Sequence, residues 1–355
     1  MTAQPAARAK RMMSEVHFAT DHTGKRIFVW DGTTYAEPPH YTSYARGNAA
    51  SVFEAAGYGD GWDIPRSVET VREIRRSCAN TGRVVTGVAS GTDANGRPTA
   101  VFTNGHVDVR TGVLHPPSPA TLIASQWGVP YDPLLPTPTY DRWVSDRGLT
   151  EQLPHIDSVL GSMFDSTYRH PRLVTLTGTW ESGKSTLLEL IDHIGNGKFP
   201  GSRTRHDHMV ARFMCNMDDA LRDTKRNVSP SVTTNNNVSV KQYLTGKRGL
   251  TRVQRLITEY PNNALHVLET VGEGWGLYED EARKWESIVA KAGVHDLFLF
   301  MNPVPKRDST HYTHDQRDAA QAVKQGLHDE ATGIAARWLN AYRVSGLRVP
   351  ASGAS

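Results

Sequence analysis

The sequence has few cysteines, no long hydrophobic run and little net charge. Cys78 and Cys215 are the two cysteines among 355 residues, which excludes a disulfide framework and a cysteine-rich zinc site. No apolar run approaches the roughly 18 residues of a membrane span. The net charge of +3 excludes a histone-like protein but permits a nucleic-acid partner. We therefore expect a cytoplasmic protein without a membrane segment.

Length and local patterning predict two domains with flexible ends. The basic N-terminal segment lacks the apolar stretch of a secretion signal, so it is expected to be a flexible arm. The expected segments are an arm at 1–14, a smaller α+β domain at 15–148, a second domain at 149–345 and a flexible tail at 346–355.

Turn residues and apolar spacing predict the elements of the first domain. Short strands are expected on either side of Gly24 and of the Asn104–Gly105 pair, because asparagine and glycine tolerate the positive φ of tight turns. Helical apolar spacing is found within residues 48–80. Four prolines within residues 130–139 predict an extended connector, and a helical stretch is expected at 149–168.

A glycine-flanked lysine lies between two apolar runs in "RLVTLTGTWESGKSTLLELI", residues 172–191. The segment fits the pattern G-x-x-x-x-G-K-[ST], in which backbone N–H groups and a helix N-terminus converge on a phosphate. Lys184 is expected to bind the β- and γ-phosphates and Ser185 a Mg²⁺ ion. The predicted nucleotide-binding residues are Gly178, Thr179, Trp180, Glu181, Ser182, Gly183, Lys184, Ser185 and Thr186.

The text around this loop resembles one family of replication proteins. The segments that carry the resemblance are "FVWDGTTY", "VFTNGHVDVRTGVLHPPSP" and "VPYDP", followed by the phosphate loop. They are similar to phage and plasmid primase-helicases of helicase superfamily three. The resemblance implies an AAA+-like P-loop NTPase core with a mainly parallel α/β sheet, preceded by a smaller α+β domain. It also implies ATP and Mg²⁺ as cofactors, single-stranded DNA as partner, and a homo-oligomeric ring, most often a hexamer.

The resemblance also assigns roles to residues after the loop. In "ARFMCNMDDAL" (211–221), Asp218 and Asp219 correspond to the Walker B acids, and Asp219 would help to hold Mg²⁺. The segment "VKQYLTGKRGLTRVQR" (240–255) is similar to the family's DNA-gripping hairpin. Its basic residues would contact the DNA backbone without selecting bases; they are Lys241, Lys247, Arg248, Arg252 and Arg255.

The family's sensor asparagine is missing from the expected strand. That strand, "NALHVLET" (263–270), has Glu269 and Thr270 where the asparagine would stand. In a second alignment Glu269 is the Walker B acid and Asn302 is the sensor; we favour the first. Arg283 is the preferred candidate for the arginine finger.

Two alternatives to a DNA-translocating helicase remain open. The missing sensor favours a nucleotide-gated DNA-binding protein with weak hydrolysis, acting in initiation or in interference with a rival element. A P-loop kinase that is indifferent to DNA would also use the phosphate loop. ATP turnover and its response to DNA distinguish the three.

Overall fold

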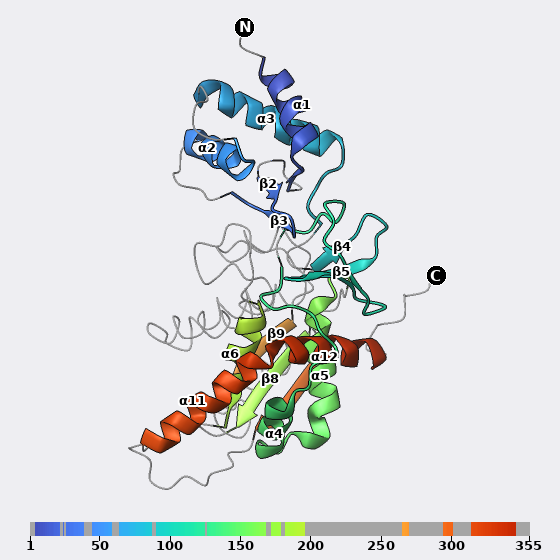
Figure 1. Ribbon diagram of the computed structural model, residues 1–355. Coiled ribbons are helices and arrows are strands. Elements are labelled where there is room, and N and C mark those ends of the chain that lie inside the picture. Colours follow the sequence, from blue (N-terminus) through green and yellow to red (C-terminus); the bar gives the residue numbers. More distant parts are fainter. Residues whose placement is uncertain are drawn as a thin grey trace, which may run out of the picture. The chain divides into compact units, whose positions relative to one another are not determined.

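The chain forms two compact units in a computed structural model (Figure 1). Unit 1 comprises residues 1–127 and 197–207, and unit 2 comprises residues 128–196 and 208–355. The structure describes residues 4–21, 24, 26–38, 45–58, 64–86, 90–124, 126–167, 172–178, 182–195, 265–269, 294–300 and 314–345.

The described residues of unit 1 form three helices and two small antiparallel sheets. Its first sheet has the order β1-β2-β3 and packs with the helices. The core between them contains Met12, Phe18, Phe53 and Ile74, each at most 3% exposed. The elements are α1 (Pro5–Glu15), β1 (Phe18–Thr20), β2 (Ile27–Trp30), β3 (Tyr35–Ala36), α2 (Ala45–Ala55) and α3 (Ile64–Asn80).

The second sheet of unit 1 is a meander in the order β4-β5-β6-β7. Phe102 pairs with Gly105, so Thr103 and Asn104 form the tight turn. The predicted turn at Asn104–Gly105 was therefore displaced by one residue. A Cβ atom at Gly105 would lie 2.4 Å from the carbonyl oxygen of His115, so this glycine permits close strand packing. The strands are β4 (Ser90–Thr92), β5 (Pro98–Phe102), β6 (Gly105–Asp108) and β7 (Leu114–His115).

The predicted flexible arm at 1–14 is wrong for most of its length. Residues 5–15 form α1, and its Ala9 and Met12 are buried against α3 and its neighbours. Pro5 occupies the first turn, where a missing N–H group costs nothing and the fixed φ favours a helix. Met13 and Val16 are partly buried against the same core, so the helix is anchored by an apolar face that its basic composition obscures.

Unit 2 contains a parallel sheet in the order β10-β8-β9, with β8 between its two partners. The strands are β8 (Arg172–Gly178), β9 (Leu265–Glu269) and β10 (Val294–Phe300). Parallel pairing is typical of sheets whose strands are connected through helices. The described helical segments of unit 2 are α4 (Pro138–Asp146), η1 (Thr150–Gln152), α5 (Leu153–Gly161), η2 (Ser162–Phe164), α6 (Lys184–Gly195), α11 (His314–Asp329) and α12 (Ala331–Val344).

The division between the units lies about twenty residues before the predicted boundary at 148/149. The proline-rich connector is irregular as far as Thr137, but Pro138 begins α4, again because proline suits the first helical turn. Helix α4 then packs with α11 of unit 2. The predicted helical stretch at 149–168 is realised as η1, α5 and η2, over residues 150–164.

Candidate phosphate-binding site

The predicted phosphate loop connects a strand directly to a helix. Strand β8 ends at Gly178 and α6 begins at Lys184. Gly183 has a φ of +96°, a conformation that favours glycine. The N–H group of Leu187 donates to the carbonyl oxygen of Gly183 at 3.1 Å, which is the first hydrogen bond of the helix. The N–H groups of the first turn of α6 therefore have no acceptor within the helix, as an anion site requires.

The described residues include six of the nine predicted loop positions: Gly178, Ser182, Gly183, Lys184, Ser185 and Thr186. Ser182 is 1% exposed and Thr186 is half-buried. Thr179, Trp180 and Glu181 lie outside the described residues. The structure thus places both glycines of the pattern and its Lys–Ser pair at one strand–loop–helix connection.

Glu269 is the predicted acid that falls within the described residues. It ends β9 and pairs with Leu176 of β8 in parallel register, two positions before Gly178. Because the carboxyl ends of parallel strands meet at one edge of a sheet, Glu269 and the start of the phosphate loop share an edge. The other predicted site residues lie outside the described residues: Asp218, Asp219, Arg283, Lys241, Lys247, Arg248, Arg252 and Arg255.

The end of α4 lies against the phosphate loop, which the sequence did not predict. A Cβ atom at Gly183 would lie 2.7 Å from Nε of Arg147 and 3.1 Å from Cζ2 of Trp143. Trp143 is 3% exposed. A side chain at position 183 would be strained by the positive φ, and it would require Arg147 to move and Trp143 to give by a few tenths of an ångström.

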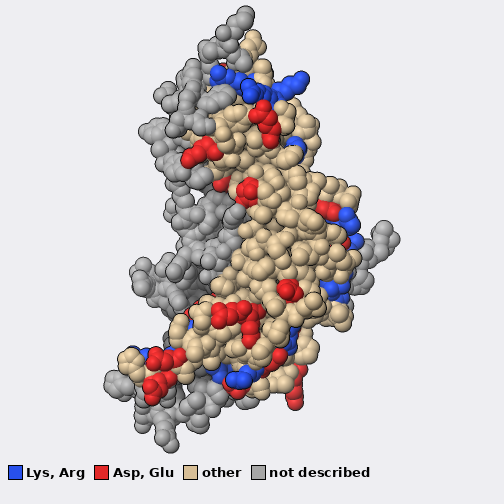
Figure 2. Space-filling view, viewed as in Figure 1, with Lys and Arg blue, Asp and Glu red and all other residues tan. Residues whose placement is uncertain are grey.

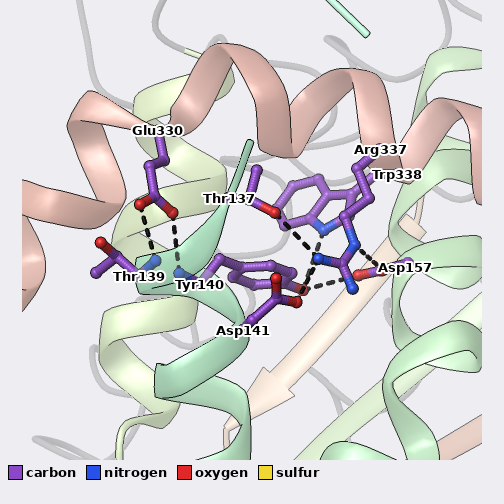
Figure 3. Close-up of polar contacts among 8 residues, drawn as sticks. All are labelled: Thr137, Thr139, Tyr140, Asp141, Asp157, Glu330, Arg337 and Trp338. Atoms are coloured by element: carbon purple, nitrogen blue, oxygen red, sulfur yellow. Dashed lines mark hydrogen bonds and ion pairs between the residues drawn. The ribbon is translucent and has the colours of Figure 1, made fainter. Parts of the chain in front are cut away.

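A polar network, buried at Tyr140 and Asp157, joins α4, α5 and α12 (Figure 3). Arg337 of α12 donates from Nε to Asp157 at 2.7 Å and from Nη1 to Asp141 at 2.5 Å. Tyr140 donates its hydroxyl to Asp157 at 2.9 Å and accepts from Trp338 Nε1 at 3.1 Å. Burial raises the pKa of Asp157, while Arg337 and Tyr140 oppose that rise. Burial also raises the pKa of Tyr140, so Tyr140 is a neutral donor.

The N-terminus of α4 is capped by a residue distant in sequence. Glu330 accepts the backbone N–H groups of Thr139 and Tyr140 at 2.8 and 3.0 Å (Figure 3). These N–H groups belong to the first turn of α4, where a carboxylate also interacts favourably with the helix dipole. The turn between α11 and α12 is thereby fixed to the start of α4.

Helix α11 in turn contacts the helix that follows the phosphate loop. Nζ of Lys324 lies 2.8 Å from Oε2 of Glu189. One turn further along both helices, the rings of His193 and His328 stack with centroids 4.2 Å apart. The ion pair is exposed and contributes little stability. The paired spacing nevertheless shows that α6 and α11 lie side by side in unit 2.

Among the described residues, no three histidine, cysteine, aspartate or glutamate side chains lie close enough to hold a metal ion. None of the described helices is long and apolar enough to cross a lipid bilayer.

Figure 2 shows basic side chains at the end of unit 1 that carries α1 and α3, with acidic side chains beside them. The ion pairs Arg11–Glu15 and Arg76–Glu73 belong to these helices, so this surface has mixed charge.

Comparison with known protein families supports the resemblance over part of the chain. Residues 69–147 match the family described as "D5 N terminal like", the N-terminal domain of phage and plasmid primase-helicases. The match includes the β4–β7 meander and α4, and this domain is associated with replication proteins. A search of curated proteins finds no significant match.

Proposed function

We propose that this chain is an ATP-dependent, DNA-translocating helicase-like ATPase that serves the replication of a phage- or plasmid-type element. The observation that carries the proposal is the G-x-x-x-x-G-K-S segment between a strand that ends at Gly178 and a helix that begins at Lys184. The family match at 69–147 supports the replication role. It also makes a P-loop kinase the weakest of the three candidates.

The loop fits a nucleoside triphosphate. Gly183 turns the backbone with a positive φ, so N–H groups can approach phosphate oxygens closely. Lys184 would bind the β- and γ-phosphates. The hydroxyl of Ser185 and a carboxylate would hold Mg²⁺, since hard oxygen ligands suit this ion. When bound, Mg²⁺ neutralises charge on the phosphates.

A carboxylate must also orient the attacking water. Asp219 has this role in the favoured alignment, and Glu269 has it in the alternative. Glu269 ends the strand beside β8, and β8 leads into the phosphate loop. The alternative alignment therefore remains open. Separate Asp219→Asn and Glu269→Gln variants identify the acid. The change at the true acid should abolish turnover and preserve ATP binding, whereas the other change should leave turnover largely intact.

DNA binding and assembly complete the proposal. The cluster of Lys241, Lys247, Arg248, Arg252 and Arg255 would hold the backbone of single-stranded DNA. A homo-oligomeric ring, with a hexamer as the expected state, would place Arg283 of one subunit near the nucleotide of its neighbour. Size determination with and without ATP tests the assembly.

A nucleotide-gated DNA-binding protein with weak hydrolysis is the second candidate. The specific observation in its favour is that β9 ends at Glu269, where the favoured alignment expects a sensor asparagine. Without that amide, the water would be poorly positioned against the γ-phosphate. Such a protein would bind ATP and DNA but turn over slowly.

Steady-state ATP hydrolysis, measured with and without single-stranded DNA, tests the proposal. We expect turnover that rises with DNA and is abolished by Lys184→Ala. Lys10→Ala, at an exposed position of α1, is the matched control and should behave as the wild type. Negligible turnover with ATP still bound would favour the second candidate. Turnover that does not respond to DNA would favour the kinase.

A further inference from the structure

Arg147 brings a positive charge to the phosphate loop from outside the G-x-x-x-x-G-K-S pattern. It is the residue directly after α4, and Nε lies 2.7 Å from the point where a Cβ atom of residue 183 would be. Gly183 immediately precedes α6. The guanidinium therefore lies beside the N-terminus of the helix that would receive the phosphates.

The surroundings of Arg147 fix its side chain. The guanidinium carbon lies 6.0 Å from the centroid of the Trp143 ring, within the range of a cation–π interaction. Trp143 itself is buried and stacks on Tyr140 with centroids 6.3 Å apart. Tyr140 belongs to the polar network around Asp157. Because Arg147 is held by this packed layer, little side-chain entropy remains to be lost when a ligand binds.

We propose that Arg147 is a phosphate-binding residue of the nucleotide site. This inference rests on the proposed binding of a nucleotide at the phosphate loop. A guanidinium presents planar N–H donors that match phosphate oxygens, whereas the ammonium of Lys184 acts as a point charge. Lys184 begins α6 and Arg147 follows α4, and two cations supplied by different elements would favour di- and triphosphates over a monophosphate. Inorganic tripolyphosphate, which has no base or ribose, carries the chemistry that Arg147 recognises.

Binding of ATP and of inorganic tripolyphosphate to the full-length chain tests this role. Arg147→Gln should weaken both by about tenfold or more, as expected for loss of a hydrogen bond to a charged group. Arg147→Lys keeps the charge and should recover part of the affinity. Arg142→Gln is the matched control, because Arg142 is an exposed residue of the same helix, and it should leave both affinities unchanged.

The outcomes separate this inference from the proposed function. If the wild type binds ATP, Lys184→Ala abolishes binding and Arg147→Gln binds as the wild type, Arg147 has no phosphate role and the inference fails alone. A loss for ATP with tripolyphosphate unaffected would also overturn it, because the contact would then be with the nucleoside. A wild type that binds neither ligand would refute the proposed function itself.

Should Arg147→Gln not fold, Arg147→Met decides the question. Methionine keeps an apolar stem against Trp143 and removes the charge. A folded Arg147→Met variant with wild-type affinity for tripolyphosphate would overturn the inference, and a loss of about tenfold or more would support it.

Discussion

Replacing Gly161 by alanine should destabilise unit 2 more than any other glycine-to-alanine change among its described residues. Gly161 ends α5 where α12 crosses it. The new Cβ atom would lie 1.9 Å from the carbonyl oxygen of Trp338 and 2.8 Å from Cβ of Tyr342. Real Cβ contacts essentially never fall below 3.0 Å. The helices would therefore have to separate by about 1.1 Å, the difference between 3.0 and 1.9 Å.

The magnitude follows from what opposes the new methyl group. Overpacking costs about 1–3 kcal/mol when side chains can adjust. Here the obstacle is backbone, and Trp338 and Tyr342 are buried around it, so we expect about 3 kcal/mol or more. For a domain of this size that corresponds to a drop of roughly 6–12 °C in melting temperature.

Gly326→Ala is the matched control for this prediction. A Cβ atom there would lie 3.0 Å from Cγ2 of Thr139, the end of a side chain that can rotate. Alanine also gains up to about 1 kcal/mol of helix propensity over glycine within α11. Urea denaturation should show a stability near that of the wild type or slightly above it. A Gly161→Ala variant that unfolds with the wild type would refute the α5–α12 packing.

Three further predictions concern buried groups. Asp157→Asn should cost about 1.5–3 kcal/mol by denaturant unfolding, because Arg337 and Tyr140 both donate to this carboxylate and a hydrogen bond to a charged group contributes about that much; an unchanged midpoint would contradict the network. Burial lowers the pKa of His106, so the unfolded chain binds the proton more readily. Unit 1 should therefore lose stability as the pH falls below about 6.5, by at most about 1.4 kcal/mol per pH unit. An equal loss of stability in the His106→Gln variant would show that another group causes the pH dependence. Burial raises the pKa of Cys78 to about 11, so in a Cys215→Ser background thiol reagents should react at neutral pH only after unfolding, and fast reaction of the native protein would show that Cys78 is accessible.

Local chemistry accounts for the elements that the sequence predicted. The first sheet has its turns at Gly24, as predicted, and at Gly32, and the turn between β6 and β7 contains Gly112; all three glycines have a positive φ. Such signals lie within a few residues of one another, so a single sequence reveals them.

Contacts between distant segments were beyond the sequence. Glu330 caps α4 across about 190 residues, and nothing in the sequence of either segment indicates that the two are in contact. Gly161 does not lie in a turn. The need for glycine at this position becomes clear only from the carbonyl oxygen of Trp338, which leaves no space for a Cβ atom. Arg147 belongs to no motif that the sequence analysis identified. Its position beside Gly183 depends on the packing of α4. The sequence did not predict this helix, because the expected proline-rich connector covers its first residues.

The most direct test of the central claim is ATP-driven movement along single-stranded DNA, measured as displacement of streptavidin from an end-biotinylated oligonucleotide. The account predicts displacement by the wild type with ATP and Mg²⁺, none with a non-hydrolysable analogue, and none by Lys184→Ala. Rapid DNA-stimulated hydrolysis by the wild type without displacement from either end would contradict a DNA-translocating motor.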